Sequence, residues 1–314
     1  MKSHRRHCFK QDPKGAALIA VLWLIAILSL AAMTTMRVIS FDMEITTSKV
    51  HGSRAFHLAE MGIAIGSNPS VDRSDPLLHR IDEANNEEFH VTLTSESSRF
   101  NINSLVFSKD KSLIRSIFME WGMELDAAQA LTDALTDWID PDDEESLNGA
   151  EVEDYHDMGR LNQPFNRPFH DIDEVALVRG MDEIEALKPD WREWFTVWSN
   201  GTLDINEADA ALIAAAAEVT ESQASIIPET VRGIDGIRNT DDDMPFKDIP
   251  SALSLLGIDA ETRQDIAQRF TLGDTTTRIT SLARSGDAKR KITVILRNRT
   301  GKPILLSRTS EIVP

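Results

Sequence analysis

The chain has 314 residues, of which 41% are hydrophobic, so it can bury a sizeable core and is not a disordered tail. Its formal net charge is −18, and residues 1–15, with five basic side chains against one acidic, leave −22 for the remainder. Such a body is repelled by phosphate backbones, which argues against a nucleic-acid partner and suits divalent cations or basic surfaces, although strong charge also serves solubility alone. The single cysteine, Cys8, lies in the basic segment, so a chain without that segment has no disulfide.

An uncharged segment follows the basic residues. Ala16–Met36 contains 21 residues, which form about 31 Å of helix and match the hydrocarbon core of a bilayer. The preceding basic residues favour a cytoplasmic N-terminus, so we expect a single span with the C-terminal body outside the cytoplasmic membrane.

An ordinary secretory signal is the competing interpretation, because Ser29-Leu30-Ala31 is an acceptable cleavage site. The apolar spacing, however, continues at a helical period as far as Ile63 and stops at Gly66-Ser67-Asn68-Pro69. This continuation favours one long helix, with a membrane-spanning part at 16–36 and an amphipathic stalk at 37–66.

Two stretches of alternating apolar and polar residues predict strands. Residues 87–105 are interpreted as a strand pair, and three strand-like segments with two intervening turns follow between 278 and 308. Between these stretches, the apolar spacing becomes helical. We therefore predict an α+β protein in which a sheet, at 87–108 and 274–314, is interrupted by a large helical domain at 109–273.

An acidic loop lies inside the helical domain. Residues 137–157 contain ten carboxylates and no Lys or Arg, and a hard cation such as calcium would relieve their repulsion. Counted from Asp140, oxygen-bearing side chains fall at the ligand offsets of an EF-hand and end at Glu151, but the sixth position is Glu145 where that loop needs glycine. We interpret it as a different loop of similar ligand richness. A solvated loop without an ion remains the alternative.

Motifs of catalysis and of nucleic-acid binding are missing from the sequence. It has no Gly-rich phosphate loop, no metal-ligand pair of histidines on one helix and no nucleophile elbow, so we predict no enzyme and no catalytic residue. Leu203–Ala217 with Phe246–Gly257 faintly resembles a helix-hairpin-helix unit. That unit has no basic patch here, and Asp241-Asp242-Asp243 would repel phosphate, so a structural helix pair is preferred.

The N-terminal junction resembles that of prepilins. A basic leader, residues 1–15, ends at Lys14-Gly15 and is followed by Ala16-Ala17-Leu18-Ile19, the arrangement at which prepilin peptidase cuts. The resemblance implies cleavage after Gly15, methylation of Ala16 and retention of the helix as an anchor. Most pilin-like subunits have glutamate five residues after the cut, whereas this chain has Ala20, as expected of a subunit that does not dock beneath another.

Further segments resemble the general secretion pathway protein K family, the large minor pseudopilins of type II secretion. They are Ser53–Gly62, Arg99–Leu105, Asp137–Asp140, Val175–Gly180 and Asp204–Ala208. The resemblance implies a pilin-like sheet, calcium with Asp140, Asp142 and Glu151 as ligands, an inner-membrane location with the C-terminal domain in the periplasm, and other minor pseudopilins and the major pseudopilin as partners. It implies a tip subunit that nucleates a pseudopilus. A minor pilin that primes a type IV pilus and a membrane-anchored extracytoplasmic hydrolase remain alternatives.

Overall fold

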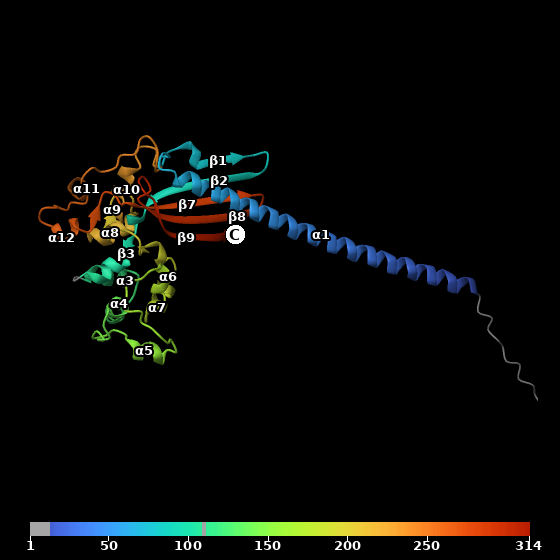
Figure 1. Cartoon of the computed structure of the whole chain (residues 1–314), viewed down its shortest axis with the longest axis horizontal. Helices are drawn as coiled ribbons and strands as arrows, with labels where there is room; N and C mark the ends of the chain where they lie inside the picture. Colours follow the sequence, from blue (N-terminus) through green and yellow to red (C-terminus); the bar gives the residue numbers. More distant parts are fainter. Residues whose placement is uncertain (1–12, 109–110) are drawn as a thin grey trace, which may run out of the picture.

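A single long helix dominates the shape of the molecule. The computed structural model describes residues 13–108 and 111–314, and its first helix, α1, runs without a break from Pro13 to Ser67. The first part of α1 projects far from the body (Figure 1), and it is long and apolar enough to cross a membrane. Gly15 and Ala16 lie near its start, and residues 1–12 of the expected leader lie outside the described residues.

The body is built on one antiparallel sheet, with strand order β1-β2-β7-β8-β9. The three expected C-terminal strands are each longer than predicted, because the hairpins β7–β8 and β8–β9 pair along nearly their whole length. The strands are β1 (His79–Asp82), β2 (Glu87–Ser95), β7 (Thr276–Ser285), β8 (Ala288–Arg297) and β9 (Ile304–Val313).

The C-terminal part of α1 packs across one face of this sheet. Ala59 and Ile63 of the helix share a hydrophobic core with Phe89, Val91 and other strand residues. Gly62 allows the close approach, since a Cβ there would lie 2.2 Å from Ser281 Oγ and 2.8 Å from Val91 Cγ2. The stalk is therefore fixed to the sheet at its far end only.

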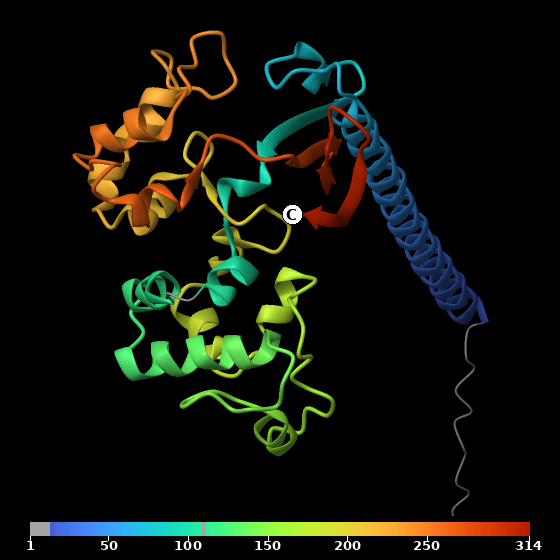
Figure 2. The same ribbon diagram turned by 60° about the vertical axis from the view of Figure 1, so that its left-hand side comes forward.

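A large helical region is inserted between β2 and β7. Its buried residues form a second hydrophobic core, and Figure 2 shows two lobes, one green to yellow and one gold to orange. Its helices are α2 (Ile102–Phe107), α3 (Ser112–Glu120), α4 (Leu125–Ile139), α5 (Val152–Asp157), α6 (Ile172–Val175), α7 (Met181–Leu187), α8 (Ala210–Ala217), α9 (Glu221–Ala224), α10 (Ile226–Val231), α11 (Ile249–Leu255) and α12 (Gln264–Ala267). The predicted α+β class, with a long first helix and an interrupted antiparallel sheet, is confirmed.

The sheet and the helical region meet at a buried ion pair. Glu96, which follows β2, is fully buried, and the Arg278 guanidinium of β7 donates two hydrogen bonds of 2.8 Å to its carboxylate. The Thr196 hydroxyl donates to the same carboxylate. Charge and hydrogen bonding thus join elements far apart in sequence.

The expected strand pair within 87–105 is wrong in its second half. Phe100–Asn101 forms β3, which pairs in parallel with β4 (Phe195–Thr196), and not with β2. A second parallel pair joins β5 (Leu203–Asp204) to β6 (Phe270–Thr271). The Asn101 side chain accepts from the Ser104 N–H at 3.2 Å and caps α2, so Ile102 begins a helix.

Candidate functional site

The acidic loop joins two helices at one end of the helical region. The twelve residues Asp140–Glu151 connect α4 to α5, with Asp140 directly after the first helix and Glu151 directly before the second. In both views, α5 lies at the end of the helical region away from the loop that precedes α11 (Figures 1 and 2).

Asp137, in the last turn of α4, organises the loop from inside. Its carboxylate is fully buried and accepts hydrogen bonds from the backbone N–H of Ser146 (3.1 Å) and of Ala150 (2.9 Å). Gly149 is required beside it, because a Cβ there would lie 1.7 Å from Asp137 Oδ2. The loop is thereby folded back onto the end of its own helix.

Three carboxylate oxygens of the loop are buried and have no hydrogen-bond partner. Both oxygens of Glu151 and one oxygen of Asp140 are in this state. Burial raises the pKa of Glu151 to about 7, with further contributions from the charges of Asp137 and Asp140. Burial, with Asp142 and Asp137, raises the pKa of Asp140 to about 6. Unpartnered buried carboxylates are costly, and they fit a cation that prefers oxygen ligands.

The three ligands implied by the family resemblance differ in their exposure in the structure. Asp140 lies close enough to both Glu151 and Asp142 for its charge to interact with theirs, but Asp142 is exposed and accepts from the Glu144 N–H at 3.0 Å. Among the described residues, no group of three or more His, Cys, Asp or Glu side chains is arranged to hold a metal ion. The ligand set of Asp140, Asp142 and Glu151 stays a prediction.

Two side chains outside the loop hold it in place. The guanidinium of Arg179 bonds to Asp154 Oδ1 (2.7 Å), to the Asn148 carbonyl (2.9 Å) and to the Gly149 carbonyl. The Asn166 amide donates to the Asp142 carbonyl (3.0 Å) and to Asp143 Oδ1 (2.9 Å), which leaves its own buried Oδ1 without a partner. No spacing pattern in the sequence indicates Asn166, because only the fold brings the segment after α5 over the loop.

An aromatic cluster underlies the loop. Trp138 is fully buried, and its ring centroid lies 5.2 Å from that of Tyr155 and 6.2 Å from that of Phe169. Burial raises the pKa of Tyr155 to about 12, so its hydroxyl stays protonated while its oxygen accepts from the Arg179 N–H at 3.2 Å. This packing makes the base of the loop rigid.

In the second acidic run, at 241–243, Asp242 and Asp243 accept hydrogen bonds from residues close by in the sequence. Asp242 accepts hydrogen bonds from the Thr240 hydroxyl (2.7 Å) and from the backbone N–H of Asp235 (3.0 Å) and Ile234 (2.7 Å), and these bonds lower its pKa to about 2. Asp243 accepts from the Asn239 N–H at 2.7 Å through one oxygen, and its other oxygen is buried without a partner. The loop that contains this run lies far from α5 (Figure 2), so the run has no part in the acidic loop described above.

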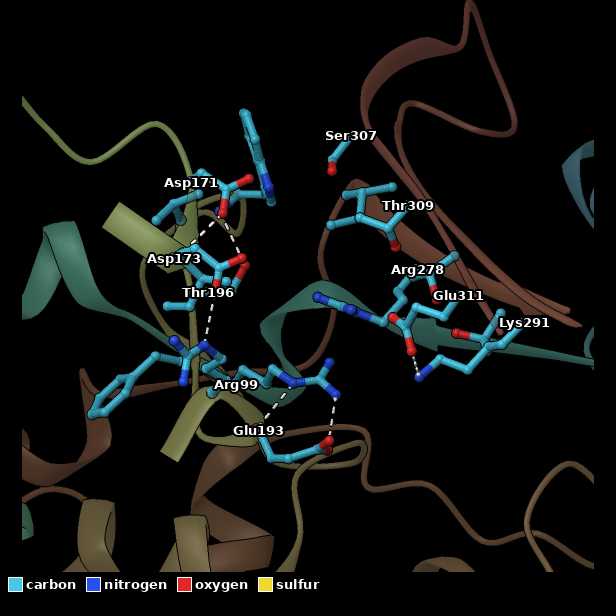
Figure 3. Close-up of a pocket in the computed structure, with 18 residues that line it drawn as sticks. Arg99, Asp171, Asp173, Glu193, Thr196, Arg278, Lys291, Ser307, Thr309 and Glu311 are labelled. Carbon is cyan, nitrogen blue, oxygen red and sulfur yellow. Dashed lines mark hydrogen bonds and ion pairs between the residues drawn. The ribbon is translucent and has the colours of Figure 1, made fainter. Parts of the chain in front are cut away.

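A polar groove of about 460 Å³ lies between the open face of the sheet and the loops of the helical region (Figure 3). Ser307, Thr309 and Glu311 of β9 line one wall, and Asp171 and Asp173 face them from the other. The charged groups largely pair with one another. The pairs are Lys291–Glu311 (3.0 Å), Arg192–Asp173 (2.7 Å), Arg99–Glu193 (3.6 Å) and Arg278–Glu96 (2.8 Å).

Comparison with known proteins gives matches to one family. A family model described as type II secretion system protein K matches residues 98–189, which include the acidic loop. Type II secretion system protein K of Klebsiella pneumoniae is 30% identical over 156 residues, covering 45% of this chain and 47% of that protein. The protein of the same description from Dickeya chrysanthemi is 36% identical over 70 residues, covering 22% of this chain and 19% of that protein. The matched segments thus span less than half the length of these relatives.

A comparison with solved structures also gives a match. A chain in the crystal structure of the GspK-GspI-GspJ complex from the enterotoxigenic Escherichia coli type 2 secretion system superposes with a TM-score of 0.56. The match has 15% sequence identity and covers 87% of this chain and 98% of that one, so it extends over both the sheet and the helical insertion. The structural match shows that the two chains share a fold, and the sequence matches make the helical region of this chain similar to that of type II secretion system protein K.

Proposed function

We propose that this protein is a minor pseudopilin at the tip of a type II secretion pseudopilus, where it nucleates assembly for protein export across the outer membrane. The observation that carries the proposal is the construction of α1. Its apolar first part is exposed, and its last turns are buried against the sheet. A helix of this kind anchors a subunit in the membrane and offers a free apolar surface to the helices of neighbouring subunits.

Two features favour the tip position. Ala20 lies in the apolar part of α1, so this chain brings no carboxylate to pair with the terminal amine of a subunit above it. The helical region extends sideways from the sheet (Figure 2), and such a width fits the end of a thin fibre better than its length.

The anchor implies processing by prepilin peptidase, with cleavage after Gly15, methylation of Ala16 and the body on the periplasmic side of the inner membrane. Intact-mass and N-terminal peptide analysis of membrane-extracted protein tests this. We expect 299 residues (314 minus 15) with a methylated Ala16, and an uncut chain for Gly15→Val. A terminus at Ala32 would indicate a secretory signal and refute the filament proposal.

The partners are other minor pseudopilins and the major pseudopilin. Support comes from the structurally similar chain, which was solved in a complex with GspI and GspJ. In a Cys8→Ser background, Ile45→Cys places a thiol on the exposed stalk, and the matched control Ala59→Cys places one against the sheet. We expect cross-links to other minor pseudopilins from position 45 alone. Cross-links only between copies of this chain would contradict a heteromeric tip.

Calcium is the ion that the acidic loop would hold, with Asp140, Asp142 and Glu151 as ligands and the free Oδ1 of Asn166 as a further donor. The support is the pair of buried, unpartnered carboxylates beside Asp137. Bound calcium would neutralise their mutual repulsion and join the ends of α4 and α5. If the melting temperature of the wild type does not rise in calcium, this part of the proposal is wrong.

The proposed function is assembly without catalysis. The groove of Figure 3 gives little support to a membrane-anchored hydrolase, because Asp173, Glu96 and Glu311 are each engaged by an arginine or lysine. Deletion of the gene in a strain with a type II system separates the two classes. We expect exported enzymes to accumulate in the periplasm, with export restored by the wild-type gene. Normal export would contradict the proposal.

A further inference from the structure

A pair of histidines lies on the edge hairpin of the sheet, apart from the acidic loop. His79 of β1 and His90 of β2 are directly opposite each other in the antiparallel register. Phe89, the neighbour of His90, is buried against α1, so both imidazoles lie on the face of the sheet that α1 does not cover. Both residues are exposed and therefore accessible to an ion from solvent.

The separation of the two rings fits a shared ligand better than a direct hydrogen bond. The Nδ1 atoms are 3.4 Å apart, which is long for a hydrogen bond from nitrogen, whose usual length is about 2.9–3.0 Å. Zinc bound to two imidazole nitrogens at ~2.0–2.1 Å and a tetrahedral angle of ~109° holds them ~3.3 Å apart. The same geometry places the ring centroids ~5.3 Å apart, and here they are 5.3 Å apart.

We propose that His79 and His90 form a surface site for a divalent transition-metal ion of the zinc type, with water in the remaining coordination positions. Imidazole nitrogen suits zinc, copper and nickel, whereas calcium takes oxygen ligands, so this site and the acidic loop select different ions. Nearby Glu88 is paired with Arg284 at 2.7 Å, so its carboxylate is engaged and two histidines carry the site.

The ion would join β1 to β2 at the edge of the sheet. β1 has four residues and is held in the sheet by β2 alone. A metal bridge between directly opposed side chains fixes the register of this short strand, which its own few backbone hydrogen bonds hold weakly.

Calorimetric titration of the detergent-solubilised full chain with zinc chloride tests the site. The background is His4→Gln, His7→Gln and Cys8→Ser, which removes the donors of the N-terminal segment, and calcium is kept in excess to occupy oxygen sites. We expect one zinc ion per chain and binding at least tenfold weaker in His79→Ala and in His90→Ala. The double variant should bind zinc no more weakly than either single variant, because the loss of one histidine already removes the chelate formed by the pair.

Control variants test whether zinc binding depends on this pair of residues. His156→Ala and His170→Ala should leave zinc affinity unchanged, and His79→Cys should restore it, because thiolate is a zinc ligand. Zinc should also raise the melting temperature of the background protein and leave that of His79→Ala unchanged. Absence of zinc binding in the background protein, or unchanged affinity in both alanine variants, would overturn the proposal.

Discussion

Replacing Glu151 by glutamine should have opposite consequences with and without calcium. Glutamine keeps the size of the side chain but removes a charge that is 6% exposed and has no hydrogen-bond partner. Its amide N–H can donate to the neighbouring Asp137 or Asp140 carboxylate, which is close enough to affect the pKa of Glu151. We therefore expect the variant to be more stable than the wild type without calcium and to lose the stabilisation that calcium provides.

The magnitude and the pH range follow from the pKa of Glu151. Burial raises it from 4.5 to about 7, and a carboxyl group with a raised pKa binds its proton more tightly in the folded state. The penalty is absent below pH 4.5, grows as the pH rises towards 7 and is fully present above it. The shift corresponds to about 3.5 kcal/mol at ~1.4 kcal/mol per unit. This is an upper limit, since neighbouring carboxylates relax when one charge is removed.

Thermal unfolding in chelator and in calcium, at pH 5 and pH 8, measures both effects. In chelator at pH 8, Glu151→Gln should melt above the wild type by as much as roughly 6–12 °C, and the difference should shrink at pH 5. Glu144→Gln, at an exposed position of the same loop, is the matched control and should match the wild type in chelator. Lower stability of Glu151→Gln in chelator at pH 8 would refute the argument that this carboxylate is strained.

Two further predictions concern the sheet. Gly62→Ala should destabilise the protein by about 1–3 kcal/mol, because its Cβ would meet β7. Gly52→Ala, in the same helix, should stabilise it by about 0.5–1 kcal/mol, because its Cβ would make only an ordinary contact of 3.7 Å with the Arg290 side chain. Chemical denaturation measures both changes. Arg278→Met should lower the free energy of unfolding by about 3–5 kcal/mol, because it leaves the Glu96 charge buried and unpaired. Arg284→Met removes a surface ion pair and should lower it by less than about 1 kcal/mol in the same assay.

The elements with strong periodicity could be predicted from the sequence. The apolar spacing that continues to Ile63 indicated one helix, and α1 ends four residues later at Ser67. The alternation within 278–308 indicated the strands β7, β8 and β9. Residues 100–101 could not be assigned in the same way, because a strand of two residues has no period and its parallel partner lies more than 90 residues further along the chain.

The acidic loop could be predicted only in part. The ten carboxylates within residues 137–157 marked this region as unusual, yet composition could not distinguish the buried Glu151 from the exposed Asp142. That distinction depends on Asp137, which draws the backbone of residues 146–150 inward, and on Arg179, which closes the loop from a segment some 30 residues away. Contacts of this kind are set by tertiary packing and leave no local pattern in the sequence.

The two hydrophobic cores separate the part of the chain that carries α1 from the helical region, which would be the cap of the proposed tip subunit. The core of the sheet includes the end of α1, whereas the core of the helical region contains no residue of the stalk. Since the acidic loop is attached to the second core through Trp138, an ion bound there would stabilise the cap without altering how the stalk meets the sheet. The Glu96–Arg278 pair at the junction links the helical region to the sheet that carries α1. In the proposed tip subunit, this ion pair would hold the cap to the anchored part, while apolar packing would stabilise each part separately.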